Sequence, residues 1–113
     1  MDFDSLSEAD KAILGQALRA AADGPFFPDW EFHTLFGLER VKFRASAHAW
    51  PKPVASHEEM TIAVNNSLHN LLGYPHGMDA EWSHWISVNR HQLNELFNRL
   101  RGDHDDRLFD RLM

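Results

Sequence analysis

Start and stop signals for α-helices recur along the whole chain. Ser56-His57-Glu58-Glu59 and Asn89-Arg90-His91-Gln92 are capping boxes, in which the first residue caps a helix and the fourth bonds back to it. Glycine or proline closes each apolar helical stretch, near positions 24, 37, 51, 73 and 102. The apolar residues between these signals recur at helical spacing, and no clean alternating run marks a strand. The pattern predicts an all-α fold, a compact single-domain bundle of five or six short helices joined by Gly/Pro turns.

The caps and stops also give the expected helix boundaries. At Gly24 and Gly73 we expect a left-handed backbone, because glycine adopts positive φ without steric cost. The whole chain, 1–113, reads as one helical domain without an internal repeat, and the tail 103–113 is expected to be flexible or to form a short terminal helix. The expected helices span residues 8–22, 29–36, 39–50, 57–72, a short aromatic stretch from 79 to 86, and 90–101.

Composition narrows the possible classes of function. Hydrophobic residues make up 43% of the 113 residues and aromatics 12%, which is enough to build a core and argues against disorder. The absence of cysteine excludes disulfides, thiolate nucleophiles and cysteine-ligated metals. The acidic N-terminus lacks a signal core, and no apolar run approaches the roughly 20 residues of a membrane helix. We therefore expect a cytoplasmic protein with no membrane contact.

The richest stretch for function follows the fourth expected helix. Polar amide side chains occur on a helix that must also contribute apolar residues to the core. A histidine lies on the following turn, which glycine and proline stiffen, and functional residues often occur on such turns. Core packing accounts for most of the tryptophans, but any that remains exposed is expected to anchor an interface. The first hypothesis is a small intracellular protein-interaction module that binds a protein partner or associates with itself. Its candidate contact residues are Asn66, Asn70, Tyr74, His76, Trp82 and Trp85.

Two alternatives remain open from the sequence. Residues 29–50 have the shape of a helix-turn-helix, with Arg40, Lys42 and Arg44 as a basic patch, although the net charge of −6 opposes binding to nucleic acid. The second alternative is a small-ligand or catalytic pocket around Asn66, Asn70 and His76, in which the amides could equally serve to hold a neighbouring loop. No two of the eight histidines are three or four residues apart, so we expect no metal and no cofactor, and an enzyme is the less favoured class.

Overall fold

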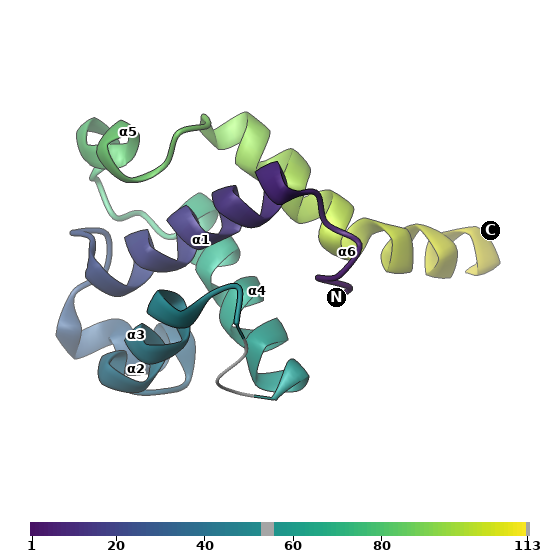
Figure 1. Ribbon diagram of the computed structural model, residues 1–113. Coiled ribbons are helices and arrows are strands. Elements are labelled where there is room, and N and C mark those ends of the chain that lie inside the picture. The colour runs from purple at the N-terminus through teal and green to yellow at the C-terminus, as the bar shows by residue number, and fades with distance from the viewer. Residues whose placement is uncertain (53–55, 113) are drawn as a thin grey trace.

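The protein is built from helices only in the part that the structure describes. This computed structural model describes residues 1–52 and 56–112, and the side chains of these residues up to Arg101 (Figure 1). Together with a 3₁₀ turn, the helices form one compact bundle, which confirms the predicted fold class. The elements in order are α1 (Glu8–Asp23), α2 (Asp29–Phe36), α3 (Arg40–Ala49), α4 (His57–Gly73), η1 (Asp79–Glu81), α5 (Trp82–Trp85) and α6 (Arg90–Leu112).

The helix starts form as the caps predict. The Ser56 hydroxyl accepts from the Glu59 amide at 3.1 Å at the start of α4. Before α6 the capping box is reciprocal, because the Asn89 amide donates to Gln92 at 3.0 Å and the Gln92 amide donates to Asn89 at 2.8 Å. Each such cap satisfies amides that the first turn of a helix leaves without partners.

Three predictions about glycines are wrong. Gly24 has φ −77°, so it is not left-handed. Glycine is needed at this position because a Cβ would lie 2.5 Å from the Ala20 carbonyl oxygen. Gly73 is the last residue of α4 and has no positive φ, whereas Gly77 in the following turn has φ +68°. The helix expected to stop at Gly102 continues through it, because α6 extends to Leu112.

The chain contains two equivalent halves, although we expected no repeat. When each residue from 8 to 50 is matched with the residue 50 positions later, α1 falls on α4, α2 on η1 and α5, and α3 on the start of α6. Buried and exposed positions then coincide through most of the match. Few side chains are identical, which is why the sequence conceals the repeat. The identical pairs are Glu8/Glu58, Leu18/Leu68, Pro25/Pro75, Asp29/Asp79, Glu31/Glu81 and Arg40/Arg90.

The halves are related by an approximate two-fold. Within each half the first helix packs on the third, α1 on α3 and α4 on α6. Between halves α2 packs on α4 and, reciprocally, α5 packs on α1, while α1 and α4 pack on each other at the centre (Figure 1). A reciprocal exchange of contacts of this kind is the signature of two-fold symmetry. Each half therefore completes the core of the other.

The core is rich in phenylalanine from the first half. Phe32 stacks on Phe36 with ring centroids 4.3 Å apart, and Phe43 packs against both. Burying these aromatic rings contributes to the stability of the domain through both area and ring packing. The largest fully buried side chains are Phe26, Phe32, Phe36, Phe43, Leu14, Leu18, Leu68, Leu71, Ile86, Leu93, Leu96 and Val64.

Candidate functional site

Asn66 and Asn70 on α4 bond the end of a neighbouring helix. The Asn70 amide donates to the Leu35 carbonyl at 3.2 Å, and the Asn66 amide donates to the Phe36 carbonyl at 3.3 Å. These carbonyls end α2, where a helix leaves its last oxygens without intrahelical donors. Both side chains therefore act as caps on the end of α2.

The first half holds the second in the same manner. Gln16, which matches Asn66, accepts from the amide and from the hydroxyl of Ser87 at 2.9 Å. Ser87 lies shortly after α5, at the position that matches Gly37 after α2. A polar side chain in the middle of each long helix thus fixes the corner of the opposite half.

Tyr74 connects the end of α4 to the first turn of α2. Its hydroxyl donates to a carboxylate oxygen of Glu31, and its ring packs on Phe27 with centroids 5.6 Å apart. The hydrogen bond to Glu31, followed by burial and by the charge of the carboxylate, raises the pKa of Tyr74 above its usual value of 10.0. The phenol is therefore held as a neutral donor, and the segment that follows it is anchored beside α2.

His76 lies between the end of α4 and the start of α6. Its Nδ1 lies 3.0 Å from the Met78 amide nitrogen, and its Nε2 lies 3.2 Å from the Leu71 carbonyl oxygen. An Arg90 nitrogen is also 3.3 Å from Nε2. The imidazole packs edge-on against Phe26, with centroids 4.9 Å apart. The ring is thus surrounded by aromatic side chains and by specific polar partners.

The two tryptophans predicted at the contact surface belong largely to the core. Trp82 is buried, and its indole nitrogen donates to the Val88 carbonyl at 2.8 Å. The Arg90 guanidinium lies 4.9 Å from the centre of its ring. Trp85 is half-buried and packs on the core cluster. Their role as partner contacts stays a prediction, and the structure gives them a packing role.

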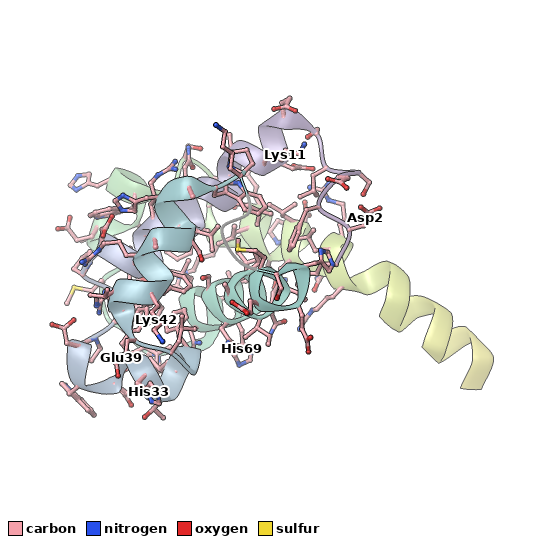
Figure 2. All side chains as sticks on the ribbon, turned by 60° about the horizontal axis from the view of Figure 1, so that its bottom comes forward. Asp2, Lys11, His33, Glu39, Lys42 and His69 are labelled. Carbon is pink, nitrogen blue, oxygen red and sulfur yellow. The ribbon has the colours of Figure 1, made fainter. Side chains whose placement is uncertain are left out.

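Two of the three residues of the expected basic patch bond the end of α1. Arg40 donates to the Ala22 carbonyl at 2.7 Å and to the Phe27 carbonyl at 2.5 Å, and it pairs with Asp29 at 2.7 Å. Arg44 pairs with Asp23 at 2.6 Å. The exposed Lys42 side chain lies near His33 and Glu39 at the α2–α3 end of the molecule, far from Asp2 and Lys11 (Figure 2).

Asp23 receives a second partner at this joint. His48 lies 2.5 Å from its other carboxylate oxygen. Burial alone would raise the pKa of Asp23, but the hydrogen bonds from His48 and Arg44, together with their charges, outweigh it and hold the pKa below its usual 3.8. The end of α1 is therefore closed by a small network of charged groups around this carboxylate.

The most exposed large apolar side chain among the described residues is Trp30. It is 80% exposed in the first turn of α2, and Val41 on α3 is 74% exposed. Met78, in the turn after His76, is 39% exposed. The sequence expected an exposed tryptophan to mark an interface but placed it in the second half. The apolar period of α2 could have found Trp30, because this residue falls opposite Phe32 and Phe36 on the helix.

One hollow of the described surface borders the candidate residue Asn66, and two others lie elsewhere. The hollow of about 370 Å³ beside α4 is lined by Asn66, Asn65 and Leu100 among others. A cleft of about 640 Å³ opens beside Trp50 and the N-terminal segment, and one of about 340 Å³ lies between α2 and α3. Among the described residues no three histidine or carboxylate side chains come close enough to hold a metal ion. No helix in that part of the chain is long and apolar enough to cross a membrane.

Comparison with known proteins adds no assignment. No protein-family model matches the chain, and neither a curated protein nor a solved structure matches it.

Proposed function

We propose that this protein is a protein-interaction module. The proposed contact surface comprises Trp30, Tyr74, Pro75 and Met78. The observation that carries the proposal is the 80% exposure of Trp30. Tryptophan is enriched at the energetic centres of interfaces, because a large rigid ring gains much when a partner removes it from water.

The internal repeat supplies a control for this reasoning. The position equivalent to Trp30 is Ala80, so the same fold needs no aromatic side chain there. Val41 likewise matches His91. Positions with structural contacts differ from position 30, because they carry the same residue in both halves. Arginine occurs at 40 and 90, and aspartate occurs at 29 and 79. The fold therefore gives no reason for Trp30, which leaves a partner as its explanation.

Neighbouring residues can extend the surface beyond one side chain. The Tyr74–Glu31 hydrogen bond ties the turn after α4 to the helix turn that carries Trp30. Pro75 and Met78 are exposed in that turn. Proline has a fixed φ, so little conformational entropy is lost when the segment is ordered against a partner.

Charge favours a protein over nucleic acid as the partner. The chain carries a net charge of −6, which repels phosphate backbones. The α2–Gly37–α3 corner keeps a helix-turn-helix shape, with Gly37 at φ +77°. Arg40 and Arg44, however, are engaged with carbonyls and carboxylates of the protein itself. The pocket alternative loses support in the same way, because Asn66 and Asn70 cap α2.

A comparison of two truncations tests the proposal. Wild type, Trp30→Ala and Ile62→Ala would be used as bait in the cells that make the protein, and sedimentation would report self-association. Ile62 is the matched control, because it is 48% exposed on α4. We expect one partner, or a second copy of the chain, whose binding is weakened by about tenfold or more in Trp30→Ala and is unchanged in Ile62→Ala. Equal binding by both variants would contradict the proposal.

A further inference from the structure

The turn after α4 is closed by the imidazole of His76. The Met78 amide donates toward Nδ1 at 3.0 Å, while Nε2 faces both the Leu71 carbonyl at 3.2 Å and Arg90 at 3.3 Å. A neutral imidazole has one accepting nitrogen and one N–H donor. If Nδ1 accepts from Met78, then Nε2 donates to Leu71. If Nε2 accepts from Arg90, the Met78 bond is absent.

Protonation removes the acceptor in either arrangement. A charged imidazole carries N–H groups on both nitrogens, so Nδ1–H would face the Met78 N–H. The added charge would also lie beside the Arg90 guanidinium on α6. Asp79 on η1 pairs with that guanidinium. The other side chains packed on the ring are aromatic, namely Phe26, Phe27 and Trp82.

In the first half the equivalent arginine bonds no imidazole of the described residues. Arg40 bonds the Ala22 carbonyl, as Arg90 bonds the Leu72 carbonyl. Arg40 then reaches the Phe27 carbonyl, whereas Arg90 reaches the His76 imidazole. Phe26 stands at the position of His76. One joint is therefore fixed by backbone oxygens, and its counterpart depends on a side chain that ordinarily changes charge between about pH 5 and 8.

We propose that His76 is a proton-operated latch on the contact surface: when neutral it holds the Pro75–Met78 turn against α4, and when protonated it releases Met78. The effect of the latch on binding rests on the proposed function: if the surface binds a partner, release of Met78 makes that binding sensitive to acid. The latch itself is a property of the turn, so it can be tested without a partner.

The first arm of the test is NMR of the full-length ¹⁵N-labelled protein between about pH 8 and 5. We expect the Met78 amide to shift with the same midpoint as the His76 ring, and its protection against exchange to fall by about tenfold as the hydrogen bond is lost. His76→Asn supplies an uncharged oxygen near the place of Nδ1 and should abolish the transition. His84→Gln, at an exposed histidine, should leave it intact. A Met78 amide that ignores the His76 titration, or an unchanged transition in His76→Asn, would overturn the latch.

The second arm measures affinity for the partner captured through Trp30. We expect binding to weaken by about fivefold or more between pH 7.5 and 5.5 in wild type and to stay constant in His76→Asn. If the turn titrates and no Trp30-dependent partner exists, the latch stands and the interaction proposal fails. If a partner binds through Trp30 and the Met78 amide does not titrate, the latch fails alone. If the turn titrates but the affinity for the partner does not change with pH, the link between the latch and binding is overturned.

Discussion

Arg40 and Arg90 lie at equivalent positions in the two halves, and each guanidinium bonds the last carbonyls of the long helix that begins its own half. Each also pairs with the matching aspartate, Asp29 or Asp79, and lies over the matching aromatic ring, Phe32 or Trp82. A charged side chain thus closes the end of a helix and holds three elements together. The same contact therefore recurs at the same position within each half.

The two arginines should differ in their contribution to stability. Arg40 has a side chain that is 16% exposed and bonds three carbonyls, whereas Arg90 is 42% exposed and bonds one. Arg40→Met should therefore lower the free energy of unfolding by about 2–3 kcal/mol, because it leaves buried carbonyls without donors. Arg90→Met should cost about 1 kcal/mol, since water can replace a partly exposed donor. Urea denaturation checks both values, and an equal loss would contradict the difference in burial.

Asn70 should prove structural. Its side chain is 7% exposed and donates to the Leu35 carbonyl, so Asn70→Ala should cost about 1–2 kcal/mol of unfolding free energy. His69→Ala is the matched control, because His69 is exposed on the same helix. Both variants should bind the partner normally when folded. Loss of binding by folded Asn70→Ala would instead favour a ligand site at this asparagine.

Two glycines should respond oppositely to alanine. Gly37 has φ +77°, so Gly37→Ala should destabilise by about 1 kcal/mol even though a Cβ there would meet no atom. Gly73 ends α4 without positive φ, and a Cβ there also meets nothing within 4 Å. Gly73→Ala should therefore stabilise by about 0.5 kcal/mol, because alanine favours the helix. Thermal melts of the two variants measure both changes in stability. Destabilisation by Gly73→Ala would contradict the helical backbone at Gly73.

Acid should weaken the joint at the end of α1. The pKa of Asp23 is lowered in the folded protein, so the unfolded chain takes up its proton first as the pH falls. The stabilisation is complete above the usual pKa of 3.8 and is lost as the pH falls through the lower folded value. Asp23→Asn should therefore show a smaller loss of unfolding free energy than wild type between about pH 5 and 3. Denaturation measured across that range checks this. An equal loss of unfolding free energy in both proteins would show that Asp23 does not contribute to the acid sensitivity.

Local sequence signals predicted the helices well because their causes are local. The Ser56 and Asn89 capping boxes form as expected, and every predicted helix exists, although the last one continues past its expected end to Leu112. The signals were weaker at helix ends, because a glycine serves several purposes. Gly24 makes room for a carbonyl, Gly37 provides positive φ, and Gly102 is simply passed by the helix.

The two-fold arrangement and the site could not be read from the sequence. The repeat is carried mainly by burial and by scattered pairs such as Arg40/Arg90, which a search for sequence identity overlooks. Arg40 and Arg44 bond groups about 20 residues away in the chain, and the sequence does not show these contacts. From the sequence alone, the cations on this helix therefore looked free to bind DNA. Exposure is likewise largely a tertiary property: the helical period of α2 points to Trp30 as a surface residue, but the structure shows how far it is exposed and that Trp82 is buried.

The most direct measurement of the central claim is photo-crosslinking from position 30 of the full-length protein. A photoreactive amino acid with a large aromatic side chain, which retains the apolar bulk of tryptophan, replaces Trp30 in one sample and Ile62 in a second, in the cells that make the protein. Because Trp30 is the proposed anchor, position 30 should yield one discrete adduct, either with a protein partner or with a second copy of the chain, and position 62 should not. The same adducts from both positions, or none from position 30, would contradict the claim that Trp30 anchors a partner.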